Sequence, residues 1–146
     1  MNKLTQFLPY FGAIPFVTFA LCLAFNVTNI PVLGDVKQAL NIYGLVIASF
    51  MAGTLWGLHL HFPKSDTSWH YKLPIFSNII AVLLWFAYIA LTPRTILIAL
   101  ILGFLSLIII DWRLMRDNLI TKDYFNIRFI VTRIVILSLI VSVVFY

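Results

Sequence analysis

The chain has 146 residues, of which 62% are hydrophobic and only 10% are charged, and its mean hydropathy is +1.03. A soluble domain of this size has too much surface to cover with so few polar residues, so the composition excludes a soluble globular protein. The formal net charge of +5 would fit nucleic-acid binding if the basic residues formed one stripe, but they lie at the ends of apolar segments. We therefore predict an integral membrane protein that contacts the lipid bilayer and does not bind nucleic acid.

Five apolar segments of membrane-spanning length follow one another along the chain. A helix needs about 20 mostly apolar residues to cross the hydrocarbon core. The predicted spans are Leu8 to Val27, Leu40 to Phe62, Leu73 to Leu91, Thr95 to Asp111 and Ile127 to Tyr146. The connections are too short to form a second domain. We predict an all-α polytopic membrane protein with a single domain, residues 1–146, built as a bundle of five transmembrane helices.

The first apolar segment resembles a signal peptide, because it follows Lys3 near the start of the chain. It is long enough to span the bilayer, however, and no convincing cleavage site follows it. Leu21 directly before Cys22 also argues against a lipoprotein cleavage site. We predict a retained first helix. Cys22 is the only cysteine, so the chain has neither an internal disulfide nor a multi-cysteine metal site.

Basic residues predict the orientation of the bundle. Alternating spans place the N-terminus and the loops 62–72 and 112–126 on one side of the membrane. This side holds Lys3, Lys64, Lys72, Arg113, Arg116 and Lys122, and the other side holds only Lys37 and Arg94. By the positive-inside rule, the N-terminus is cytoplasmic and the C-terminus lies outside. The lack of a transit peptide favours the inner membrane of a bacterium over that of an organelle.

The third and fourth predicted spans are joined by Thr92, Pro93 and Arg94, a connection too short to reach across a bundle. Threonine is a good N-cap, and proline suits the first turn of a helix. We predict that these two spans form an antiparallel helical hairpin.

The second predicted span carries small residues in two rows at four-residue spacing. The rows are Gly44, Ala48 and Ala52, and Ser49, Gly53 and Gly57. Small residues at this spacing let helix backbones approach closely in a membrane. We predict that this helix lies at the centre of the bundle and that the rows pack against other helices of the chain. The alternative is that a row forms a surface for another subunit.

Arg133 is predicted to lie within the hydrocarbon core, deeper than the membrane interface on the cytoplasmic side. The residues after it span about 20 Å as a helix, which is less than the hydrocarbon thickness of about 30 Å. A charge at that depth is unfavourable unless it is paired or snorkels to the interface. We predict an ion pair with Asp111, with snorkelling as the alternative. Trp56 and His59 end the second span on the same side, so the candidate polar pocket comprises Trp56, His59, Asp111 and Arg133.

The sequence predicts no catalytic residues, no metal site and no cofactor. His59 and His61 are two residues apart, so on a helix they point in different directions and do not easily bind one metal. The chain has no glutamate, and it shows no nucleophile elbow, phosphate-binding glycine loop or zinc motif. Proton transfer by His59 stays open, because histidine titrates near neutral pH.

Several stretches are similar to one known family. They are Tyr10 to Phe16, Tyr43 to Gly57, Leu73-Pro74 with Trp85, Asp111 to Arg113, and Tyr124 through Arg128 to Arg133. They resemble an uncharacterised bacterial and mitochondrial inner-membrane family, a domain of unknown function that includes the mitochondrial transmembrane protein sixty-nine. The resemblance implies a five-span inner-membrane protein without an established activity. The family pattern has a histidine before the tryptophan of span two, where this chain has Leu55. Any role that the resemblance implies for that histidine is therefore either absent from this chain or shifted to His59.

Three functional hypotheses follow from these observations. The first is a non-catalytic accessory or assembly subunit of a membrane complex, such as a respiratory complex, because soluble loops and catalytic motifs are lacking. The second is a binder or carrier of a lipophilic small molecule, such as a quinone, lipid or porphyrin, because 16% of the residues are aromatic. The third is a proton-coupled transporter or membrane enzyme that uses the candidate polar pocket.

Overall fold

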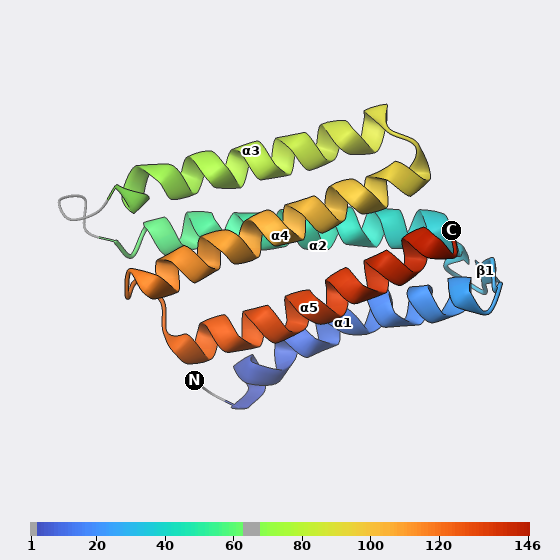
Figure 1. Ribbon diagram of the computed structural model, residues 1–146, viewed down its shortest axis with the longest axis horizontal. Coiled ribbons are helices and arrows are strands. Elements are labelled where there is room, and N and C mark those ends of the chain that lie inside the picture. Colours follow the sequence, from blue (N-terminus) through green and yellow to red (C-terminus); the bar gives the residue numbers. More distant parts are fainter. Residues whose placement is uncertain (1–2, 63–67) are drawn as a thin grey trace.

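The computed structural model describes residues 3–62 and 68–146, which form five long helices and one small β-hairpin (Figure 1). The helices are α1 (Lys3–Ala24), α2 (Val36–His59), α3 (Trp69–Ala90), α4 (Pro93–Arg116) and α5 (Lys122–Val144). All five are long and apolar enough to cross a membrane. The predicted all-α, five-span fold is confirmed, and the protein is a multi-pass membrane protein.

The observed helices are offset from the predicted apolar segments: α1 and α2 end three residues earlier than predicted, at Ala24 and His59, whereas α4 and α5 extend into polar sequence. The predicted span from Thr95 to Asp111 is part of α4, which continues to Arg116. Likewise, α5 begins at Lys122 rather than at Ile127. Hydropathy marks the stretch that suits the hydrocarbon core, but a helix continues into the interface, where the heads of lysine and arginine reach water.

The helices run back and forth along one long axis (Figure 1). The start of α1, the end of α2, the start of α3 and the α4–α5 connection lie at one end, called here the N-terminal end. The β-hairpin, the α3–α4 connection and the C-terminus lie at the opposite, C-terminal end. This is the alternation that the sequence predicts. Lys64, which contributes to the predicted charge asymmetry, lies outside the described residues.

The second helix occupies the central position expected for it. It packs against α1, α3 and α4, whereas α5 packs against α1 and α4. The structure places the first row of small residues, Gly44, Ala48 and Ala52, inside the bundle. A Cβ added at Gly44 would lie only 2.5 Å from Cδ1 of Leu100 on α4. The absence of a side chain at Gly44 therefore permits the close approach of α2 and α4.

The second row of small residues faces away from the other described helices. Gly53 and Gly57 are exposed, and a Cβ added at either would meet no neighbouring heavy atom within 4 Å. The sequence predicts that this row packs against other helices of the chain, but among the described residues no helix packs on Gly53 or Gly57. This face of α2 is open to lipid or to another protein.

The connection between α3 and α4 forms the predicted antiparallel hairpin. Thr92 is the N-cap of α4, and Pro93 follows at the start of the helix. The Thr92 carbonyl accepts hydrogen bonds from the Ile96 amide and the Thr95 hydroxyl, each at 3.0 Å. The bond from the Ile96 amide is the first bond of the α4 helix, and the Thr92 side chain makes no cap hydrogen bond with a backbone amide of the first turn.

A feature that the sequence analysis missed lies between α1 and α2. Strands β1 (Asn29–Ile30) and β2 (Gly34–Asp35) pair antiparallel. Gly34 has a φ of 73°, a conformation that glycine adopts without strain. Asp35 then caps α2 by accepting a hydrogen bond from the Gln38 amide at 2.8 Å. The hairpin thereby fixes the start of the central helix.

The two glycine rows give a direct test of the helix packing. We expect Gly44→Leu to destabilise the protein by about 1–3 kcal/mol or more, because a larger side chain overpacks the contact with Leu100. Gly53→Leu is the matched control, and we expect it to leave the free energy of unfolding of the isolated chain nearly unchanged. Unfolding in detergent, followed by circular dichroism, measures both. Equal destabilisation by the two substitutions would contradict the observed orientation of α2.

Candidate functional site

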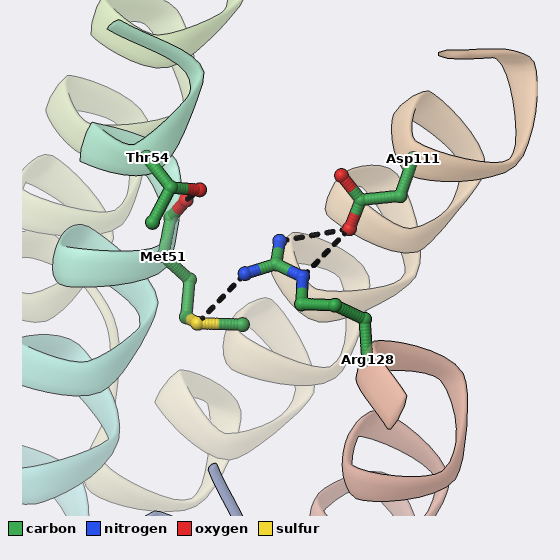
Figure 2. Close-up of polar contacts among 4 residues, drawn as sticks. All are labelled: Met51, Thr54, Asp111 and Arg128. Carbon is green, nitrogen blue, oxygen red and sulfur yellow. Dashed lines mark hydrogen bonds and ion pairs between the residues drawn. The ribbon is translucent and has the colours of Figure 1, made fainter. Parts of the chain in front are cut away.

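A buried ion pair joins α4 to α5 in the N-terminal half of the bundle (Figure 2). Asp111 is 1% exposed and Arg128 is 6% exposed. Nε and Nη2 of Arg128 both donate to Oδ2 of Asp111, at 2.9 Å and 2.8 Å. Oδ1 of Asp111 is buried and has no hydrogen-bond partner among the described residues. The pair is therefore one-sided, with a single carboxylate oxygen accepting both bonds.

The third guanidinium nitrogen contacts the central helix. Nη1 of Arg128 lies 3.0 Å from the sulfur of Met51, opposite to the side that faces Asp111 (Figure 2). A thioether is a weak hydrogen-bond acceptor. The guanidinium carbon also lies 5.8 Å from the centre of the Tyr124 ring, one turn earlier on α5. Arg128 thus connects α2, α4 and α5, but its Nη1 has only a weak partner.

The short turn between α4 and α5 places the two charges at the same depth. Asp111 lies five residues before the end of α4, and Arg128 lies six residues after the start of α5. At about 1.5 Å per residue, both are about 7–9 Å from the turn. The Leu119 amide donates to the Leu114 carbonyl at 2.9 Å, and Thr121 caps α5. These bonds reverse the direction of the chain, so that α5 runs antiparallel to α4 and the side chains of Asp111 and Arg128 meet.

The predicted ion pair between Asp111 and Arg133 is wrong, because Asp111 pairs with Arg128. Arg133 lies about 16 Å along α5 from its start, well past Asp111, and it is rotated by about 140° from Arg128 around the helix. Its side chain is exposed, and its guanidinium lies 5.5 Å from the centre of the Phe129 ring. Arg133 faces outward, which fits the alternative of snorkelling.

The other two residues of the predicted polar pocket lie at the contact between α2 and α3. Trp56 Nε1 donates to Oδ1 of Asn78 at 3.3 Å, and the Trp56 and His59 rings are 4.9 Å apart. Nδ1 of His59 lies 2.5 Å from the Trp56 carbonyl, and the His70 ring is 5.4 Å from that of His59. The structure therefore gives Trp56 and His59 partners on α2 and α3, and it does not bring them together with Arg133.

A cavity of about 260 Å³ lies beside the ion pair, between α1, α2, α4 and α5. Most of its walls are apolar, but Arg128, Thr54, Tyr124 and Thr132 also line it. Leu8 on α1 and Phe50 on α2 line the cavity and are 60% and 69% exposed. Because these two residues face outward, the cavity opens to the surroundings of the bundle between α1 and α2.

The ion pair places a neutralised guanidinium beside an apolar space. The carboxylate of Asp111 neutralises the charge of Arg128, so the pair carries no net charge into the apolar surroundings. Arg128 brings a guanidinium to the wall of this apolar space, whereas the Thr54 hydroxyl already donates to the Met51 carbonyl at 2.7 Å. Among the described residues, no group of three histidine, cysteine or acidic side chains is placed to hold a metal ion.

A second polar cluster lies at the C-terminal end of the bundle. Nδ2 of the buried Asn41 donates to the Pro93 carbonyl at 3.1 Å and to the Tyr146 hydroxyl at 3.3 Å. Arg94 Nε donates to the Val143 carbonyl at 3.1 Å. Burial raises the pKa of Tyr146, so its phenol stays neutral around physiological pH. These bonds hold the end of α5 against α2 and α4.

Sequence reasoning missed Arg128, Met51, Thr54 and Tyr124 as parts of one site. Placing the start of span five at Ile127 made Arg128 a residue of the interface, whereas the observed helix places it almost two turns inside. One signal was available. In two antiparallel helices joined by a short turn, residues at equal distance from the turn lie at the same depth, and this rule pairs Asp111 with Arg128.

The fold and the site define a class: a five-span helical membrane protein with a buried ion pair beside a cavity that opens outward. The chain belongs to a family described as protein of unknown function (DUF3429), whose model matches residues 1–144. The expected membership of an uncharacterised family is thereby confirmed. No curated protein and no solved structure matches the chain.

The ion pair predicts strongly non-additive effects of substitution. We expect Arg128→Met or Asp111→Leu alone to lower the free energy of unfolding by about 3–5 kcal/mol, because each leaves a buried charge unpaired. The double variant should recover most of this loss, because both charges are then gone. Unfolding in detergent measures all three. Arg133→Met is the matched control and should have little effect; additive losses at Asp111 and Arg128 would refute the pair.

Proposed function

We propose that the protein binds a lipid-soluble small molecule in the cavity between α1, α2, α4 and α5. The observation that carries this proposal is the position of Arg128, a buried charged side chain that lines an otherwise mostly apolar cavity. Small-molecule sites are typically apolar spaces with a few polar groups that fix the orientation of the ligand. Thr54 and Tyr124 also line this cavity, and the Thr54 hydroxyl already donates to the Met51 carbonyl at 2.7 Å.

The size of the cavity restricts the kind of ligand. About 260 Å³ lies just below the range of about 300–1,000 Å³ that is typical of small-molecule pockets. This volume favours one hydrocarbon chain or a single-ring head group, as in a lipid or a quinone. It disfavours a porphyrin, which has four rings joined in a plane.

The position of the opening supports entry from the bilayer. Leu8 and Phe50 line the cavity and face outward from adjacent helices that both span the membrane. A molecule dissolved in the lipid could move between these side chains without crossing water. The ligand would then place its polar group near Arg128 and keep its apolar part towards α1 and α2.

A second candidate function is an accessory subunit of a membrane complex. The outward orientation of Gly53 and Gly57 favours it, because small residues on a lipid-facing helix surface permit close packing of another helix. Ser49, one turn before Gly53, belongs to the same row. The ligand proposal ranks first because the cavity is a property of the chain itself, whereas this surface needs a partner that is still to be found.

Filling the cavity tests the ligand proposal. Gly12 lines the cavity, and a Cβ added there meets no other group within 4 Å. We expect wild-type protein, extracted in mild detergent, to retain a small lipophilic molecule, which native mass spectrometry detects as an added mass. The share of protein that carries this mass should be at least about 90% lower for Gly12→Leu than for the wild type, because the leucine side chain fills the cavity. Gly53→Leu, which faces away from the cavity, is the control and should retain it.

Two results of the same experiment would contradict the ligand proposal. One is a wild-type spectrum without any retained small molecule after extraction in several mild detergents. The other is a stoichiometric second protein that Gly53→Leu releases while Gly12→Leu does not, which would support the accessory subunit instead.

We further propose that the protein lies in a bacterial inner membrane with its N-terminus in the cytoplasm. The N-terminal end of the bundle carries Lys72, Arg113, Arg116 and Lys122, whereas Arg94 and Lys37 lie towards the C-terminal end. This asymmetry fits the positive-inside rule. We expect alkaline phosphatase fused after Tyr146 to be active and green fluorescent protein fused there to be dark. The reverse result would contradict the proposed topology and place the C-terminus in the cytoplasm.

A further inference from the structure

The guanidinium nitrogen of Arg128 that does not contact Asp111 indicates which head group the site would accept. Nε and Nη2 are both engaged by Oδ2 of Asp111, at 2.9 Å and 2.8 Å. Nη1 points away from the carboxylate towards the sulfur of Met51, 3.0 Å away (Figure 2). Arg128 and Met51 both line the cavity. The contact between Nη1 and the sulfur therefore joins two residues of the cavity wall.

The sulfur of Met51 is a replaceable partner. A thioether accepts hydrogen bonds weakly, and methionine has three rotatable bonds that let it repack with little strain. A guanidinium N–H in apolar surroundings binds an oxygen acceptor more strongly than a thioether. An oxygen atom of a ligand would thus take the place of the sulfur at Nη1, and the methionine side chain would turn aside.

The balance of charge excludes an anionic head group. Asp111 already neutralises Arg128, and among the described residues Arg128 is the only basic side chain that lines the cavity. A carboxylate or phosphate would bring a second negative charge beside Asp111 in a membrane-spanning segment, where unpaired charges are strongly disfavoured. An uncharged oxygen acceptor avoids this energy. A carbonyl oxygen has the required lone pairs and no charge.

We infer that the cavity selects uncharged lipophilic molecules with a carbonyl oxygen, such as a quinone or an ester, and that this oxygen accepts a hydrogen bond from Nη1 of Arg128 in place of Met51. This inference rests on the proposed ligand-binding function and adds the chemical class of the ligand. Thr54 and Tyr124 line the cavity as well. The apolar body of the ligand extends towards Phe50 and Leu8.

Four probes with the same decyl tail on one ring separate the possible head groups. They are decyl benzoquinone, methyl decylbenzoate, decylbenzene and decylbenzoate, all compared at the same neutral pH, at which the carboxylate is ionised. Native mass spectrometry of the delipidated full chain in detergent measures the dissociation constant of each. We expect the quinone and the ester to bind about 10–100-fold more tightly than decylbenzene, the range expected for one hydrogen bond to a charged donor. Decylbenzoate should bind no more tightly than decylbenzene.

The first two probes also separate the two natural sources of such a carbonyl. Tighter binding of decyl benzoquinone assigns the site to quinones, and tighter binding of the methyl ester assigns it to ester lipids. Either result supports the inference, because both carry the same uncharged acceptor.

Three variants test the role of Arg128. In the double variant Asp111→Leu with Arg128→Met, the ratio of affinities between decyl benzoquinone and decylbenzene should fall to about one. Met51→Leu keeps the side-chain volume but removes the sulfur, so we expect the ratio to stay the same or to rise. Arg133→Met is the control outside the site and should not change the ratio. Circular dichroism checks that each variant is folded.

The outcomes distinguish the inference from the proposed function. Equal binding of all four probes, tightest binding of decylbenzoate, or a carbonyl preference that survives in the double variant would overturn the head-group inference while the cavity still binds ligands. A failure of all four probes to bind the folded wild-type chain would overturn the proposed function and the inference with it.

Discussion

The pairing of Asp111 with Arg128 inside an apolar bundle is the constraint on which the rest of the structure depends. Either charge alone would be strongly disfavoured at this depth, so the two must meet. Their contact fixes the register of α5 against α4, because a shift of one turn would separate them. Through Nη1 and Met51, the same guanidinium also touches α2. One charged group thereby relates three of the five helices.

Other polar contacts and close backbone approaches hold the remaining helices. In lipid, burying apolar side chains gives little net drive for helix association, so packing and hydrogen bonds between helices gain weight. The Tyr43 hydroxyl donates to the Gly12 carbonyl at 2.9 Å and joins α2 to α1. Asn41 joins α2 to the start of α4 and to Tyr146. Gly44 lets α4 approach α2. The central helix is thus fixed at several levels of the membrane.

The sequence was sufficient for the fold because each span carries its own signal in its hydropathy, and the short turn at Thr92 and Pro93 defines one helical hairpin. It was insufficient for the site because pairing between helices depends on rotation and depth together. Arg133 had a suitable charge but the wrong face, and Arg128 was hidden by a helix start placed five residues too late. Gly53 and Gly44 show the same ambiguity, since spacing alone does not tell which row of small residues faces inward.

Stability alone does not explain why a charged pair lies beside the cavity. Buried ion pairs replaced by apolar residues of similar size often leave a protein equally or more stable, so the pair sets the register of α4 and α5 without being needed for net stability. The geometry of the pair also differs from one built only for strength, because Oδ2 accepts both bonds, Oδ1 has no partner among the described residues, and Nη1 meets only a thioether. A pair that leaves a strong donor with a weak acceptor at a cavity wall retains capacity for another hydrogen bond. That retained capacity is what a ligand site requires, and it connects the most buried charges of the fold with the proposed function.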